Sequence, residues 1–248
     1  MLETSIKNKL GFITLNHPKK NNALSPALRN ALIEALHQMG NDDTVHVIIL
    51  HSNGKNFCAG ADLSNMLDVA QKSLDDNLKD AHHFATLFHQ LHSCSKPTIA
   101  CAQGKIMGGG IGLLAACDIV VSEENAEFCF SEVKLGLVPA TITPFVLNKI
   151  SVQMAKYLML TAEWFDAKKA KEIGLVDHIC DTHAIDLAIR LAQQLLENDQ
   201  LAMQTIKKWL QTLRPISTAA LNQGASLLSQ IRSTQRTQKR IQGFLDSR

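Results

Sequence analysis

The chain has 248 residues, of which 46% are hydrophobic and 19% are charged, and its formal net charge is +2. This composition excludes a disordered or fibrous protein and is ample for a large buried core. No apolar run approaches the roughly 20 residues that a membrane-spanning helix needs, and the N-terminus lacks the pattern of a secretory signal. We therefore expect a cytoplasmic protein with no membrane partner.

The cysteines and histidines give no sign of a metal centre. The six cysteines are dispersed in apolar settings without a C-x-x-C pair, which is typical of reduced core thiols rather than of a disulfide framework or a zinc site. Four histidines share one predicted helix but lack the H-E-x-x-H spacing of a zinc ligand set. We therefore expect no metal. These histidines are His82, His83, His89 and His92.

Short strands and helices alternate along the first part of the chain. Residues 10–16 and 45–51 are apolar and rich in β-branched side chains, which predicts strands. Between them, Ser25 is a predicted N-cap and Pro26 the first residue of a helix. Further short strands are predicted at residues 98–102, 119–122 and 128–130. This order indicates an α/β core.

The last part of the chain is predicted to be helical throughout, with no strand after about residue 180. We place a boundary near residue 195, between a core of residues 1–195 and a helical region of residues 196–248. Such a region buries few apolar residues by itself. It must therefore pack either on residues 1–195 of the same chain or on another subunit. Eight of its residues from Gln200 onward are basic and one is acidic, so this region is expected either to be a solvated helical surface or to meet the phosphates of a ligand or of a nucleic acid. Its few aromatic residues weaken the nucleic-acid alternative.

Two predicted strands each lead into a run of very small residues. The first run is Cys58-Ala59-Gly60-Ala61, and the second is Gly108-Gly109-Gly110 at the start of a helix. Small residues allow a ligand to approach the main chain, and a helix N-terminus favours negative charge. Two backbone donors on one carbonyl oxygen would form an oxyanion hole, in which each donor contributes about 3–4 kcal/mol of transition-state stabilisation. The alternative is that the glycines only permit close packing.

These runs carry a family resemblance. Residues 57–63 resemble the F-x-A-G-A-D-[LI] signature of the crotonase (enoyl-CoA hydratase/isomerase) family, and residues 104–118 resemble its G-x-x-x-G-G-G-x-x-L-x-x-x-C-D signature. Further matches in family order cover nearly the whole chain. The resemblance implies a spiral core of ββα turns with a C-terminal α-helical trimerisation region, assembled as a homotrimer or a dimer of trimers. It maps the two oxyanion donors to the N–H groups of Ala59 and Gly109.

The resemblance also implies the chemistry. Typical family hydratases use two glutamates, of which Glu132 is present here, whereas Gly112 stands in the place of the other. Burial should raise the pKa of a lone carboxylate and suit it to general acid/base work. Residues 132–145 resemble bacterial methylglutaconyl-CoA-type hydratases, so we expect a hydratase, a carbon–oxygen lyase. The alternatives are an isomerase that uses Glu132 alone and a non-catalytic relative that binds a CoA ester or RNA.

In this family the coenzyme A thioester is the substrate, and the resemblance implies no separate cofactor. The adenine pocket maps to the main chain of Asn22, Ala23 and Leu24. The candidates for the phosphates are Lys19, Lys20 and Lys55. Phe244 is expected to cover the adenine of a neighbouring subunit. Thr141 and Thr143 are expected either to orient water or substrate, or to cap a helix. The remaining predicted CoA contacts are Ala61, Asp62 and Leu63.

Overall fold

A computed structural model describes residues 1–247 of the chain. Its main sheet has six strands in the order β1-β2-β3-β4-β6-β9, parallel except for the β1/β2 pair. A smaller sheet has the order β5-β7-β8. The strands are β1 (Leu2–Lys7), β2 (Leu10–Leu15), β3 (Val47–Ser52), β4 (Thr98–Ala102), β5 (Lys105–Met107), β6 (Ile119–Glu123), β7 (Glu127–Cys129), β8 (Phe165–Asp166) and β9 (His178–Cys180).

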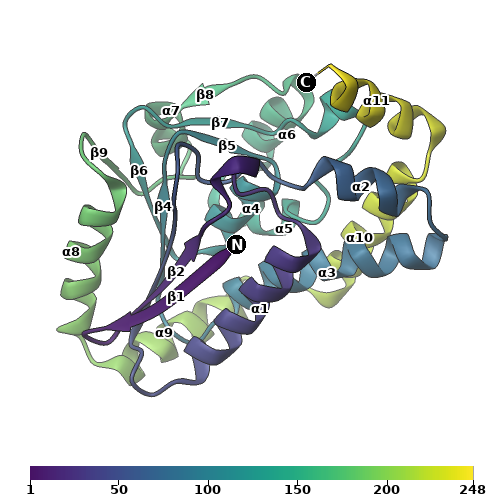
Figure 1. The fold of residues 1–248 in the computed structure, drawn as a ribbon. Coiled ribbons are helices and arrows are strands. Elements are labelled where there is room, and N and C mark those ends of the chain that lie inside the picture. Colours follow the sequence, from purple (N-terminus) through teal and green to yellow (C-terminus); the bar gives the residue numbers. More distant parts are fainter. Residues whose placement is uncertain (248) are drawn as a thin grey trace.

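The middle of the chain winds as a spiral, because β4 is followed at once by β5 and β6 by β7, so that the strands from β4 to β7 alternate between the two sheets (Figure 1). The helices in the core are α1 (Pro26–Asn41), α2 (Leu63–Ala70), α3 (Leu74–His92), α4 (Gly109–Ala116), α5 (Thr143–Lys149), α6 (Val152–Thr161), α7 (Ala167–Glu172) and α8 (Ala184–Leu196). Two 3-10 turns are η1 (Pro18–Lys20) and η2 (Glu132–Leu135).

All five predicted strands are present, with ends shifted by at most two residues. The strands that the sequence did not reveal are β1, β5, β8 and β9, the last of which has only three residues. Strand β1 is largely exposed and lacks an apolar alternation, and it is held by pairing with β2 through a turn in which Asn8 and Lys9 have positive φ. Strands β5 and β8 have three and two residues, too few to show a periodicity.

Helix α1 begins where the sequence predicts. The Ser25 hydroxyl accepts a hydrogen bond from the Leu28 amide at 3.3 Å, and Pro26 occupies the first turn, where its missing N–H has no cost. The helix buries Leu28, Leu32 and Leu36 against the core and packs on α3.

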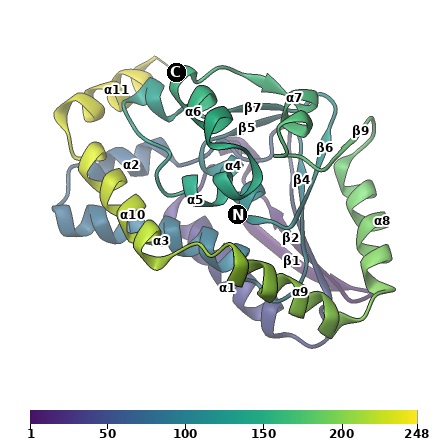
Figure 2. The same ribbon diagram turned by 180° about the vertical axis from the view of Figure 1, so that it is seen from behind.

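The main sheet is buried on both faces. Along β3, Ile48 and Leu50 belong to the large core with α1 and α3, whereas Val47 and Ile49 pack with α8 in a second cluster. Because neighbouring strand residues point to opposite faces, this continuous apolar run serves both layers. Figure 2 shows α8 alone on its side of the sheet.

Three helices follow α8, namely α9 (Gln200–Leu213), α10 (Thr218–Arg232) and α11 (Gln235–Asp246). Helix α10 packs along α3, and α11 packs on α2 and η2, so both lie on the core of their own chain. Arg232 at the end of α10 is fully buried and donates to Asp80 at 2.6 Å and to the Asn77 side chain at 2.9 Å. That residues 196–248 form a separate unit stays a prediction.

Helix α9 differs from its neighbours because it buries none of its residues. It is tied to the core by Lys207, whose ammonium group lies 2.5 Å from Asp118 and 2.8 Å from the carbonyl oxygen of Lys96. Its exposed side chains include large apolar residues. Within residues 1–247, no helix combines the length and apolar character that a bilayer span requires.

Candidate active site

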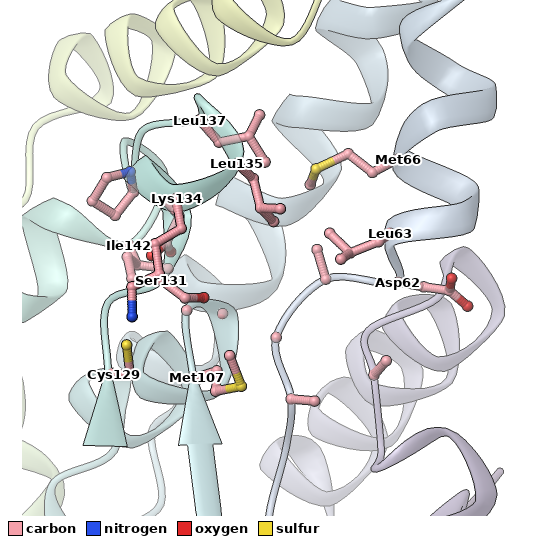
Figure 3. A pocket seen from close by; sticks show the side chains of 18 of the residues that line it. Asp62, Leu63, Met66, Met107, Cys129, Ser131, Lys134, Leu135, Leu137 and Ile142 are labelled. Atoms are coloured by element: carbon pink, nitrogen blue, oxygen red, sulfur yellow. The ribbon is translucent and has the colours of Figure 1, made fainter. Parts of the chain in front are cut away.

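One cavity of about 510 Å³ lies between the segment after β3, the start of α4, η2 and the C-terminal helices. Figure 3 shows Leu63 and Met66 on one wall, with Leu135 and Leu137 on the other. Exposed lysines, Lys19 and Lys20 among them, stand at its rim. The cavity therefore combines a polar mouth with an apolar interior.

The two small-residue runs meet at this cavity. A β-carbon on Gly60 would lie 2.9 Å from the carbonyl oxygen of Met107 and 3.3 Å from the amide nitrogen of Gly109. A β-carbon on Gly110 would lie 2.4 Å from the carbonyl oxygen of Cys58. Both runs therefore need glycine for close packing, and the same closeness brings two stretches of main chain to one ligand site.

The amide of Ala59 is not free. Its N–H donates to the carbonyl oxygen of Asn21 at 2.9 Å. The sequence-based assignment of this N–H as an oxyanion donor is therefore wrong. An amide has a single proton, and the proton of Ala59 already points at Asn21, so it cannot also point at a ligand.

The amide two residues further on is the free one. Within residues 1–247 the N–H of Ala61 makes no hydrogen bond, and Ala61 lines the cavity. The preceding carbonyl oxygen, that of Gly60, accepts from the Leu24 amide at 2.7 Å. Because no described peptide bond is cis, the Ala61 N–H points to the side opposite that carbonyl group, away from Leu24.

Gly109 supplies a second free amide. It is the first residue of α4, and its N–H makes no hydrogen bond within the described part of the chain. The first amides of a helix have no intrahelical acceptor, and the helix dipole favours negative charge there. The preceding Gly108 has φ +46°, a conformation that L side chains rarely adopt.

Glu132 points its carboxylate at the same place. Its Oε1 lies 2.9 Å from the position of a β-carbon on Gly108, and its Oε2 is buried without a hydrogen-bond partner. Burial raises the pKa of this carboxyl group from 4.5 to about 7. The raised pKa expected from the sequence is confirmed, and at neutral pH the group can both accept and deliver a proton.

No second carboxylate can occupy the Gly112 position. A β-carbon there would lie 2.3 Å from Cγ2 of Ile142 and 2.9 Å from Cε1 of Phe88. Apolar side chains therefore fill the space into which a second glutamate would extend. Of the two carboxylates that line the cavity within residues 1–247, Glu132 is the one without a cation partner, since Asp62 is paired with Lys20 at 3.0 Å.

Comparison with known proteins identifies the family. The model of the family described as Enoyl-CoA hydratase/isomerase matches residues 5–248. The chain belongs to the enoyl-CoA hydratase/isomerase family. The 2,3-dehydroadipyl-CoA hydratase of Escherichia coli is 31% identical over 250 residues, which cover 100% of this chain and 96% of that protein. An enoyl-CoA hydratase of Mycobacterium tuberculosis is 32% identical over 225 residues, which cover 89% of this chain and 82% of that protein.

Solved structures of the same family share the fold. The enoyl-CoA hydratase of Shewanella pealeana has a TM-score of 0.83 at 34% identity, with 100% of this chain and 94% of that chain covered. The enoyl-CoA hydratase of Bacillus halodurans has a TM-score of 0.89 at 26% identity, with 98% and 99% covered. The α/β crotonase-like spiral expected from the sequence is confirmed, and so is the membership of a family of enoyl-CoA hydratase enzymes.

Some of the residues predicted to contact CoA line the cavity, and others do not. Ala23, Ala61 and Leu63 line the cavity, as do Lys20 and Asp62. Asp62 also caps α2, because its carboxylate accepts from the amides of Ser64 and Asn65. Asp62 therefore ties this part of the cavity lining to the start of α2.

Three predicted contacts lie outside the cavity lining. Asn22 is fully buried, and its side-chain amide donates to the carbonyl oxygens of Asn53 and Asn56 at 3.0 Å each. Leu24 is buried against Gly109, and Lys55 is exposed away from the cavity. Asn22 and Leu24 thus shape the loop that carries the site instead of lining the cavity themselves.

Phe244 lines the cavity of its own chain, together with Leu245 of α11 and Leu228 of α10. Helix α11 packs on α2 and η2 of its own chain. That Phe244 covers the adenine of a neighbouring subunit stays a prediction. Thr141 lines the cavity, but the Thr143 hydroxyl donates to the carbonyl oxygen of Pro139 at 2.8 Å at the start of α5. Thr143 is the first residue of α5, whose N-terminus has no side-chain cap, so the capping role expected for this threonine is not observed.

Several lining residues carry no sequence signal of function. Met66, Phe84 and Phe88 belong to α2 and α3 and read as ordinary core positions of amphipathic helices. Only the fold shows that these apolar positions face a cavity. Within residues 1–247, no group of three or more His, Cys, Asp or Glu side chains is close enough to hold a metal ion.

Proposed function

We propose that this enzyme hydrates an α,β-unsaturated acyl-CoA, with the thioester carbonyl oxygen at the amides of Ala61 and Gly109. The observation that carries the proposal is the Glu132 carboxylate, whose Oε2 is buried without a hydrogen-bond partner and whose pKa is raised to about 7, beside two free main-chain amides. A CoA thioester supplies both an oxygen for the amides and a carbon that exchanges protons. In this proposal the thioester is the substrate and no separate cofactor takes part.

Each group then has one task. The two amides stabilise the negative charge that develops on the thioester oxygen as water adds to the β-carbon. The ionised Glu132 takes one proton from that water, and the oxygen of the water forms the new bond to the β-carbon. The same carboxyl group then delivers the proton to the α-carbon of the enolate, which completes the addition of one water.

Double-bond migration is the second candidate, and the Gly112 position favours it. Ile142 and Phe88 fill that space with apolar side chains, which leaves one carboxylate to serve the reacting carbons. A lone Glu132 could remove a proton from one carbon of a 3-enoyl thioester and return it to another. This isomerisation needs no water and leaves the substrate mass unchanged.

Incubation in deuterated water with mass spectrometry distinguishes the two reactions. Crotonyl-CoA should gain the mass of one deuterated water if the enzyme is a hydratase. Conversion of 3-hexenoyl-CoA into 2-hexenoyl-CoA, with deuterium exchange but no added water, would identify an isomerase. Absence of both reactions, with retained binding of CoA esters, would contradict the enzymatic proposal and favour a non-catalytic binder.

We further propose that CoA enters at the polar rim. Lys19 and Lys20 are the cations closest in sequence to the segment that carries Ala23, and all three line the cavity. Lys20 is held toward Asp62 by an ion pair, and its side chain is still 55% exposed. A phosphate at this rim would meet positive charge without losing all of its hydration.

The proposed assembly is a homotrimer or a dimer of trimers, formed in part by residues 196–248. Helix α9 supports this proposal, because none of its residues is fully buried in its own chain while Ile206, Trp209 and Leu213 are each more than half exposed. Large apolar side chains gathered on one helix are typical of an interface.

The six cysteines are free thiols, which fits the reducing cytoplasm that we propose as the location.

A further inference from the structure

The inner wall of the cavity is formed by two aromatic rings of α3. Phe88 lies next to the proposed carbonyl site, since its Cζ is 3.7 Å from a β-carbon on Gly109. Phe84, one turn earlier, lines the same cavity, and the two rings stack with centroids 6.5 Å apart. A thioester held at Gly109 would therefore extend its acyl group along Phe88 toward Phe84.

A buried cation lies directly behind the Phe84 ring. The guanidinium carbon of Arg29 is 3.7 Å from the centroid of that ring, and the Arg29 residue is 1% exposed. Its Nε is buried without a hydrogen-bond partner, while one terminal nitrogen pairs with Asp80. The other oxygen of Asp80 pairs with Arg232 at 2.6 Å. Two guanidinium groups thus share one carboxylate, which leaves positive charge one ring away from the cavity.

The helices that pack on α3 add buried apolar side chains to the cavity lining. Met66 of α2 and Leu228 of α10 are two of them. The lysines of the lining belong to η1 and η2 rather than to α3 and are exposed. A carboxylate pressed against the Phe84 ring would lose its hydration without a partner, which is strongly unfavourable.

We propose that Phe84 determines the acyl specificity of this enzyme by blocking direct contact between the acyl group and Arg29, so that the cavity accepts uncharged acyl groups and rejects those that end in a carboxylate. This inference rests on the proposed function, since it assumes that the cavity holds an acyl-CoA. It also assigns a role to the orphaned Nε of Arg29: once the ring is removed, that donor and its positive charge would face the cavity. The specificity is therefore reversible by one substitution.

Two saturated esters with equal numbers of acyl carbons test this without turnover. Hexanoyl-CoA ends in a methyl group and adipyl-CoA in a carboxylate, and calorimetry on the full chain gives a Kd for each. The wild-type protein should bind hexanoyl-CoA at least about 30-fold more tightly. Phe84→Ala should reduce this ratio at least tenfold, mainly by tighter binding of adipyl-CoA to the uncovered Arg29.

Phe88→Ala is the matched control. It also removes a ring from the cavity wall, but the ring stacked over a guanidinium group is that of Phe84. The Kd ratio should therefore stay near its wild-type value even if both affinities change. If either alanine variant fails to fold, as judged by circular dichroism, Phe84→Leu and Phe88→Leu give the same comparison with smaller voids.

Two results would overturn the proposal. One is a wild-type ratio within about threefold of unity, and the other is an equal change of the ratio in the Phe84 and Phe88 variants. Either result leaves the proposed hydratase function intact, because hydration of crotonyl-CoA is measured separately. Failure of the wild-type protein to bind either ester would overturn the proposed function, and this specificity with it.

Discussion

The Oε1 atom of Glu132 lies 2.9 Å from the position that a β-carbon on Gly108 would occupy. The middle residue of the glycine run supplies an amide, and its first residue leaves room for the carboxylate. A side chain at Gly108 would push Glu132 away and would be strained at φ +46°. The glycine run therefore makes room for the Glu132 carboxylate and also supplies the Gly109 amide. The predictions that concern Glu132 and Gly109 test two parts of one site.

Glu132→Gln should lower kcat by about 10²–10⁴-fold, because the amide cannot take a proton from water. The side chain keeps its size, so the Kd for a saturated acyl-CoA should change little. Stopped assays with crotonyl-CoA measure the rate, and calorimetry measures the binding. Wild-type activity in this variant would remove Glu132 from the mechanism.

The same substitution should change the pH dependence of stability. The pKa of Glu132 is raised from 4.5 to about 7 by burial, so its favourable contribution to folding is complete below pH 4.5 and is lost as the pH rises through 7. Glu132→Gln avoids this loss. Its free energy of unfolding should therefore match the wild-type value near pH 4 and exceed it by about 3 kcal/mol near pH 8. Urea titrations at both pH values measure the difference, and parallel curves would argue against a raised pKa.

Gly109→Pro should remove one oxyanion donor without breaking α4, because proline is well tolerated in the first helical position. We expect kcat to fall by about 10²–10³-fold. Gly109→Ala is the control, since it adds a β-carbon at the same place, 3.0 Å from Cδ1 of Leu24, but keeps the N–H. Equal losses in the two variants would point to crowding by the side chain instead of a missing donor.

Gly112→Ala should destabilise the protein by about 1–3 kcal/mol, because its β-carbon would lie 2.3 Å from Cγ2 of Ile142. Adding Ile142→Ala to that variant should recover part of the loss by removing the clashing atom. Thermal unfolding of the two single variants and the double variant gives the coupling. Strictly additive effects would show that the two positions do not compete for space.

Trp209→Asp should weaken the proposed assembly, because it places a charge among the exposed apolar residues of α9, where Trp209 itself is 60% exposed. Light scattering after size-exclusion chromatography should show a smaller mass than for the wild-type protein. Thr212→Asp, at an exposed polar position of the same helix, is the control and should leave the mass unchanged. A monomeric wild-type protein would contradict the assembly proposal directly.

Much of the fold was predictable because local patterns agreed with the final structure. The Ser25 cap, the apolar run of β3 and the helical spacing beyond residue 182 each follow from preferences of neighbouring residues. The strands that escaped prediction, such as β5, are too short for a period and exist because another strand lies beside them. Their stability comes from partners distant in sequence, which local patterns do not encode.

The candidate active site also has some features that were predictable from the sequence and others that were not. The sequence by itself determined the two small-residue runs, the position of Glu132 and the absence of a carboxylate at Gly112, because these are matters of residue identity. Only the tertiary structure decided that the Ala59 amide is used by Asn21 while that of Ala61 is free, and that Arg29 lies behind Phe84. The physical reason is that a hydrogen bond or a stacking contact depends on which atoms meet in space, and segments tens of residues apart provide the partners.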